Sequence, residues 1–124
     1  MRKLRAASRV LLTAADLTVL AGCGHTAAVG TSRTIRIALS EYRVNPQSIR
    51  SRQGELTLVV ENDGRLAHDL AVSSHGRIVG QTPPLQPGGR ASLFLSLSAG
   101  SYLMTSTLFS DQALGVYGTL TVTR

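Results

Sequence analysis

Sulfur and aromatic side chains are scarce in this 124-residue chain. It has one cysteine, Cys23, no tryptophan, three tyrosines and two phenylalanines. A single cysteine excludes an internal disulfide, so a folded domain must be stabilised by its apolar core alone. The length corresponds to one domain. The low aromatic content also argues against a nucleic-acid-binding surface, in which aromatic residues are interleaved with a basic stripe.

Basic residues exceed acidic residues by 13 to 7, which gives a net charge of +6 at pH 7. The excess is concentrated at the N-terminus, where four basic residues occur among the first nine: Arg2, Lys3, Arg5 and Arg9. The chain after position 22 has nine basic and six acidic side chains, which is ordinary for a solvated surface. No nucleic acid is therefore expected as a partner.

A short apolar run follows the basic N-terminus. Residues 10–22 (VLLTAADLTVLAG) are fewer than the roughly 20 that a transmembrane helix needs. Their order after the basic residues is typical of a secretory signal peptide, although Asp16 interrupts the apolar run. The run ends in LAGC, Leu20 to Cys23, which resembles the lipobox of bacterial lipoproteins. This resemblance implies cleavage before Cys23 and acylation of its thiol and its new amino group.

The lipobox divides the chain into three expected segments. Residues 1–22 are a lipoprotein signal peptide, residues 23–33 are a lipidated cysteine with a flexible tether, and residues 34–124 are the domain. The tether prediction rests on the small and polar residues GHTAAVGTSR. Several acyl chains, palmitate among them, would anchor the protein in membrane lipid through Cys23, on the extracytoplasmic face. The alternative is a chance cysteine at the end of an ordinary secretory signal.

Beyond the tether, apolar and polar residues alternate with the period of β-strands. The alternation is clearest in residues 35–39, 56–60 and 91–97. Turn signals rich in Asn, Pro and Gly recur between these stretches. No segment after Cys23 has a sustained helical period. The pattern predicts an all-β fold, an antiparallel Greek-key sandwich of seven to eight strands.

Two stretches of this pattern resemble the cupredoxins, the small copper-carrying β-sandwiches that include the plastocyanin-like domains. In the first stretch a turn at Asn62 and Gly64 leads to His68 and Asp69. The second stretch, GSYLMTSTLFSDQALGVYGTLTV, resembles the ligand loop of the family in its glycines and its apolar residues. The resemblance covers residues 34–124 and implies a cupredoxin-like sandwich.

The resemblance also assigns four ligand positions, of which only His68 has the ligand of the family. The other three positions hold Ser106, Asp111 and Val116 where the family has Cys, His and Met. A blue-copper centre needs a thiolate, two imidazoles and a weak axial sulfur. A serine hydroxyl is a poor substitute for a thiolate, and valine cannot coordinate a metal. The sequence therefore predicts that the blue-copper centre is missing; no cofactor is expected, and copper is the alternative.

His68 has three interpretations: a buried histidine satisfied by hydrogen bonds, a weak copper ligand assisted by Asp111, or a surface residue. The first interpretation predicts that Ser106, His68 and Asp111 converge in a polar network at the vacated ligand positions. These residue types also occur in hydrolase triads. No nucleophile elbow or oxyanion hole accompanies them, so no enzyme activity is expected. Met104 is expected to fill the core.

These observations support two functional interpretations. The preferred one is a lipid-anchored binding or structural module of the cell envelope, with an unidentified envelope protein as its partner. Its expected contact surface is the loop end at residues 62–68 and 108–117, which includes five apolar residues: Leu108, Phe109, Leu114, Val116 and Tyr117. The alternative is a copper-binding protein for delivery, tolerance or electron transfer that uses His68 with non-standard ligands.

Overall fold

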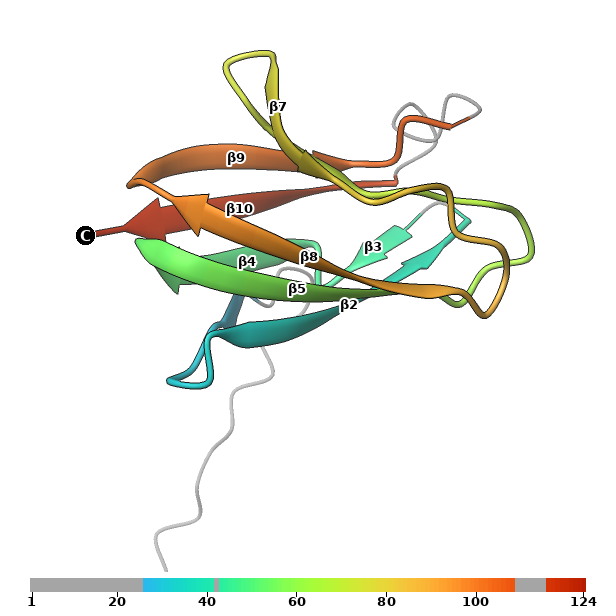
Figure 1. Ribbon diagram of the computed structural model, residues 1–124, viewed down its shortest axis with the longest axis horizontal. Coiled ribbons are helices and arrows are strands. Elements are labelled where there is room, and N and C mark those ends of the chain that lie inside the picture. The colour runs from blue at the N-terminus through green and yellow to red at the C-terminus, as the bar shows by residue number, and fades with distance from the viewer. Residues whose placement is uncertain (1–25, 42, 109–115) are drawn as a thin grey trace, which may run out of the picture.

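The computed structural model describes residues 26–41, 43–108 and 116–124, which form ten strands in two packed layers (Figure 1). Helices are absent from these residues, so none of them forms a helix that could span a membrane. The predicted all-β sandwich is confirmed. Every described strand lies between Thr26 and Thr123, so a chain that begins at Gly24 contains the whole described fold.

The larger sheet has six strands in the order β1-β4-β10-β9-β6-β7. Their bounds are Thr26–Ala28 (β1), Ser48–Arg52 (β4), Tyr117–Thr123 (β10), Gly100–Thr105 (β9), Ala71–Ser74 (β6) and Arg77–Gln81 (β7). β4 pairs in parallel with both β1 and β10, whereas the remaining neighbours in this sheet are antiparallel.

The smaller sheet has four strands in the order β3-β2-β5-β8. Their bounds are Arg43–Asn45 (β3), Thr34–Ser40 (β2), Gly54–Asn62 (β5) and Arg90–Leu97 (β8). β2 and β5 are parallel, so both sheets are mixed, whereas the sequence predicted antiparallel pairing throughout. The difference arises because a period of two specifies which face of a strand is buried and not the direction of its neighbour.

β1 lies within the segment that the sequence predicted as a tether. It pairs with β4, and the partly buried Val29 that follows it packs against the core. The Arg33 guanidinium donates hydrogen bonds to the main-chain oxygens of Arg52 and Glu55, at 2.7 and 3.0 Å. The described fold therefore includes residues before Thr34, the expected start of the domain.

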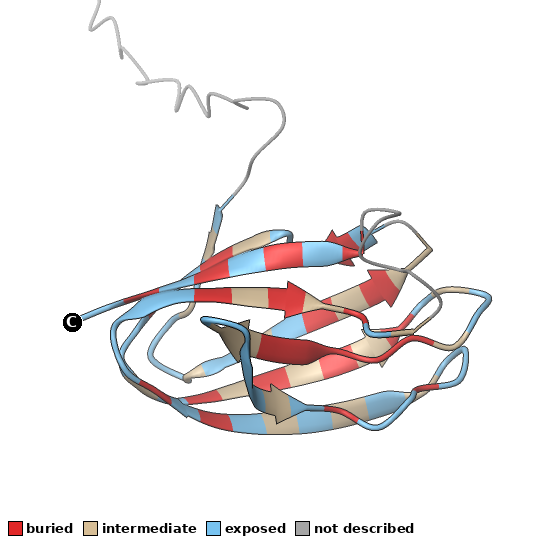
Figure 2. Ribbon diagram, turned by 90° about the horizontal axis from the view of Figure 1, so that it is seen from above, coloured by how far each residue is buried: buried red, intermediate tan, exposed pale blue. Residues whose placement is uncertain are grey.

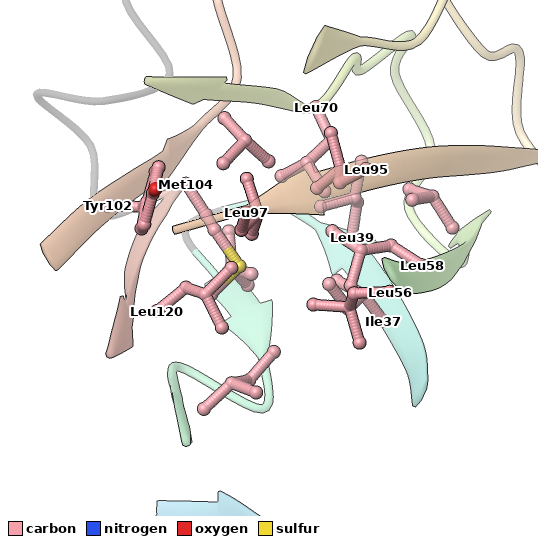
Figure 3. Close-up of a cluster of buried hydrophobic side chains, with 14 of the residues drawn as sticks. Ile37, Leu39, Leu56, Leu58, Leu70, Leu95, Leu97, Tyr102, Met104 and Leu120 are labelled. Carbon is pink, nitrogen blue, oxygen red and sulfur yellow. The ribbon is translucent and has the colours of Figure 1, made fainter. Parts of the chain in front are cut away.

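Buried and exposed residues alternate along the strands (Figure 2). The inward side chains of the two sheets meet in one apolar core. In Figure 3, Tyr102, Met104 and Leu120 of the larger sheet face Leu39 and Leu58 of the smaller sheet. Met104 is fully buried, which confirms its predicted place in the core.

Leu58 on β5 is fully buried, whereas Phe94 on the adjacent β8 is 77% exposed. We expect Leu58→Ala to lower the free energy of unfolding by about 3 kcal/mol, because it opens a cavity between the sheets. The matched control Phe94→Ala removes a larger side chain from the surface, and we expect a change below about 0.5 kcal/mol. Urea unfolding measures both effects. An equal loss in the two variants would contradict the orientation of β5 and β8.

Candidate functional site

The predicted site residues of the described chain lie at one end of the sandwich, at the right in Figure 1. β6 and β9 are antiparallel neighbours, and Ala71 is opposite Thr105. Because of this register, the residues just before β6 lie beside those just after β9. Asp69 and Ser106 are brought together in this way, although they are 37 positions apart in the sequence.

Asp69 is a buried carboxylate surrounded by hydrogen-bond donors. Its Oδ1 accepts hydrogen bonds from Ser106 Oγ at 3.1 Å and from the Thr107 main-chain N at 2.6 Å. Its Oδ2 accepts hydrogen bonds from Gln81 Nε2 at 2.9 Å and from Thr107 Oγ1 at 2.5 Å. These four residues, the Asp69 cluster, join the start of β6, the end of β7 and the end of β9.

Burial is the largest single influence on the Asp69 carboxyl, and alone it would raise the pKa. The hydrogen bonds from Thr107, Gln81 and Ser106 together outweigh burial, so the pKa of Asp69 is lowered from its ordinary value. The carboxylate is therefore ionised at neutral pH. Hydrogen bonds to an ionised acceptor are stronger than neutral ones, which offsets the cost of burying the charge.

His68 belongs to a second cluster, which is built around Glu41. The His68 side chain is 1% exposed, and its Nε2 lies 3.2 Å from Glu41 Oε1. The same carboxylate oxygen accepts hydrogen bonds from the main-chain N of Arg65 and Leu66, at 2.6 and 2.7 Å. Two main-chain hydrogen bonds with Leu85 fix the backbone of His68. Glu41, Arg65, Leu66 and His68 form the Glu41 cluster, in which successive main-chain N–H groups bind an anion.

Asn62 shapes the loop that supplies these donors. Its side chain is fully buried, and its Nδ2 donates hydrogen bonds to the main-chain oxygens of Leu66 and Leu85, both at 2.8 Å. Its Oδ1 accepts a hydrogen bond from Gly64 N at 2.9 Å. A Cβ atom at Gly64 would lie 2.6 Å from Glu41 Oε1, so glycine permits the close approach of the carboxylate to the loop.

The pKa of Glu41 is lowered from 4.5 to about 2, and the hydrogen bond from the Leu66 main chain is the largest cause. Further hydrogen bonds, including those from Arg65 and His68, outweigh the opposing effect of burial. Because the ionised carboxylate can only accept, Nε2 is the protonated nitrogen of His68.

The structure places Ser106 and His68 in neighbouring clusters. Ser106 Oγ donates a hydrogen bond to the Asp69 carboxylate and accepts one from the Asp69 main-chain N at 3.3 Å. His68 is buried and hydrogen-bonded to Glu41, in agreement with the first of its three interpretations. Asp111, the third member of the predicted network, lies outside the described residues, as does Cys23.

The predicted contact surface at the loop end is partly interior. Asn62, His68 and Val116 are buried, so they offer no contact area to a partner. The side chains of Leu66 and Tyr117 are 58% and 42% exposed at this end. Leu108 is half-buried, and the predicted apolar residues at 109 and 114 lie outside the described residues.

Three residues of these clusters were missed by reasoning from the sequence: Glu41, Gln81 and Thr107. Glu41 is 27 positions from His68, and Gln81 is 12 positions from Asp69, so no local motif joins either pair. Thr107 had a usable signal, because it directly follows a predicted ligand position and a polar residue there can reach the neighbouring loop.

The donor set of the described residues does not fit a blue-copper centre. Within residues 26–41, 43–108 and 116–124, no group of three His, Cys, Asp or Glu residues could hold a metal ion. At the predicted positions, Ser106 presents a hydroxyl that donates to a carboxylate, and Val116 has no donor atom in its side chain. The thiolate and axial sulfur that blue copper requires have no counterpart at these two positions.

The Asp69 cluster predicts a large effect of removing its carboxylate. We expect Asp69→Ala to lower the free energy of unfolding by about 3 kcal/mol, because donors from Ser106, Thr107 and Gln81 lose their acceptor. The matched control is Asp63→Ala, which removes an exposed carboxylate from the nearby loop and should cost less than about 0.5 kcal/mol. Equal effects in urea unfolding would contradict the structural role of the cluster.

The Glu41 cluster predicts a loss of stability in acid. The pKa of Glu41 is lower in the folded chain than in the unfolded chain, so its contribution is present above pH 4.5 and disappears as the pH falls toward 2. Glu41→Gln should therefore flatten the dependence of the unfolding free energy on pH between 4.5 and 2. Glu55→Gln, which removes an exposed carboxylate from β5, is the control. Unchanged pH dependence in Glu41→Gln would rule out this contribution.

Comparison with known proteins yields structural matches only. No protein-family model matches the chain, and no curated protein matches it. Reduced auracyanin from Roseiflexus castenholzii is similar with a TM-score of 0.68 and 21% identity, over 77% of this chain and 100% of that one.

Two further solved structures match with lower identity. Auracyanin A from Chloroflexus aurantiacus, described as a "blue" copper protein, has a TM-score of 0.60 and 16% identity over 77% of this chain and 99% of its own. Reduced rusticyanin has a TM-score of 0.60 and 14% identity over 78% of this chain and 83% of its own. At such identities the similarity concerns the backbone, and together with the two mixed sheets it shows that the chain has a cupredoxin-like fold.

Proposed function

We propose that this chain is a lipid-anchored, non-enzymatic module of the cell envelope. In this account the cupredoxin-like domain is held at its loop end by hydrogen bonds in place of a blue-copper centre. The observation that carries the proposal is the hydrogen bond from Ser106 Oγ to Asp69, because Ser106 occupies the position that the resemblance assigns to the thiolate.

The polar groups of the described residues support this account. None of their buried side-chain nitrogen and oxygen atoms lacks a hydrogen-bond partner. A loop end that depended on a metal would leave ligand atoms without partners in a metal-free chain. The Asp69 and Glu41 clusters instead satisfy their carboxylates with donors from the protein itself.

The anchor is proposed from the LAGC sequence that ends at Cys23. Acyl chains on its thiol and amino group would give lasting attachment, because one chain alone binds a membrane only marginally. The proposed partner is a protein of the envelope. The exposed apolar side chains of Leu66 and Tyr117 would form part of the contact at the loop end.

The anchor is tested with the whole chain in a bacterium that is fed an alkyne-labelled fatty acid. Label should appear on the wild-type protein and be absent from Cys23→Ser. His25→Ala, two positions away, serves as a matched control that should keep the label. Equal labelling of wild type and Cys23→Ser would contradict acylation at this cysteine.

Copper binding through His68 is a second candidate, and the Glu41 contact favours it. Histidines that ligate metals commonly donate their other ring N–H to a carboxylate, which orients the ring. Glu41 Oε1 lies 3.2 Å from His68 Nε2, which is the contact expected of such an orienting carboxylate.

The two candidates are separated by titrating Cu(I) and Cu(II) into the chain that begins at Gly24. This chain carries His25→Ala, because a free Gly-His amino terminus itself binds Cu(II). The first proposal predicts no stoichiometric binding that depends on His68 and no intense visible band. One equivalent of copper that is lost in His68→Ala and retained in the matched control His75→Ala would establish the second candidate instead.

A further inference from the structure

Four exposed arginines lie on the strands at one side of the sandwich. Three strands carry them, and we call the set the arginine edge: Arg36 on β2, Arg43 on β3, and Arg50 and Arg52 on β4. None of the strands β1 to β4, as the structure bounds them, contains an aspartate or glutamate. The charged side chains on these four strands are therefore all positive.

The four strands lie on the same side of the two sheets. β1 and β4 end the larger sheet, and β3 and β2 end the smaller one. β10 contacts β3, and β7 contacts β8 at the opposite side, so the sheets stack with these ends together. Figure 1 shows β2, β3 and β4 grouped in this way.

The opposite side of the molecule has a different charge pattern. Arg90 on β8 is paired with Glu61 on β5, with its guanidinium N 3.1 Å from Oε2. β5 also carries Glu55, and β7 carries Arg77. Apolar side chains are exposed there, namely Ile78, Val79 and Phe94. Among the described strands, the arginine edge thus groups four exposed arginines without an acidic residue, whereas the opposite side has two arginines, one of them paired, together with acidic side chains.

The described chain begins at the arginine edge. Thr26 is the first residue of β1, which pairs with the arginine-bearing β4. Three peptide units separate Cys23 from Thr26, so their Cα atoms are at most about 11 Å apart. The core contact of Val29 and the hydrogen bonds of Arg33 fix the chain that follows. Acyl chains on Cys23 would therefore place β1 next to the lipid headgroups.

We propose that the arginine edge docks on anionic headgroups of the membrane in which Cys23 is anchored. The inference rests on the proposed acylation and adds a fixed orientation, with β1 and β4 toward the bilayer. The attraction of basic residues to anionic lipid extends over about one Debye length, roughly 10 Å at 0.1 M salt, which matches the reach from Cys23. The exposed apolar residues of β7 and β8 would then face away from the membrane.

The test uses the unacylated chain that begins at Gly24, so its result does not depend on acylation. Binding is measured by co-sedimentation in 25 mM salt with vesicles of phosphatidylcholine alone or with 30% phosphatidylglycerol. Wild type should bind the anionic vesicles at least about tenfold more tightly than the neutral ones, and the difference should shrink at 150 mM salt.

Two variants that each remove three charges locate the surface. The triple change Arg36→Gln, Arg43→Gln and Arg50→Gln should weaken binding by about tenfold or more, because each basic residue near the surface contributes about fivefold. The matched triple change removes three exposed arginines elsewhere: Arg65→Gln, Arg77→Gln and Arg90→Gln. It should weaken binding less than about threefold. Thermal unfolding confirms that both variants are folded.

Wild-type binding without preference for anionic vesicles, or equal losses in the two triple variants, would overturn the proposal. Either outcome would leave the fatty-acid labelling of Cys23 unaffected. Conversely, if only the arginine-edge variant loses binding to anionic vesicles, this result would support the arginine edge as a lipid-binding surface even if Cys23 were not labelled. The two proposals are therefore tested separately.

Discussion

The loop end of this domain depends on one ionised carboxylate. Asp69 accepts four hydrogen bonds, two on each oxygen, from three residues that lie 12 to 38 positions away from it in the chain. The antiparallel register of β6 and β9 brings them together, and the charge makes each bond stronger than a neutral one. In a cupredoxin-like fold a metal can join these loops. In this chain the hydrogen bonds of the Asp69 cluster join them.

The sequence predicted which face of each strand is buried more successfully than it predicted the direction of the strand that pairs with it. Along β8, Leu95 and Leu97 are buried and Phe94 is exposed, as the period of two required. The parallel pairing of β4 with β10 and of β2 with β5 could not be predicted, because alternation carries no information on the direction of the adjacent strand. β1 escaped detection because its three residues, Thr-Ala-Ala, are too short and too small to show a pattern.

The resemblance named two residues of the candidate site. The resemblance located His68 and Ser106, and both are buried at the loop end. Their hydrogen-bond partners were not found, since Glu41 and Gln81 come from distant strands and only tertiary structure brings them close. The orientation suggested by the arginine edge also required the fold, because its arginines belong to three strands of two different sheets.

The central claim is that the Asp69 cluster holds the loop end without a metal. The most direct measurement is amide hydrogen exchange of Thr107 in the metal-free protein, because this N–H donates to Asp69 although the residue is exposed. The account predicts slow exchange, comparable to that of the strand residues of β9, and fast exchange when copper and other metals are absent would contradict it.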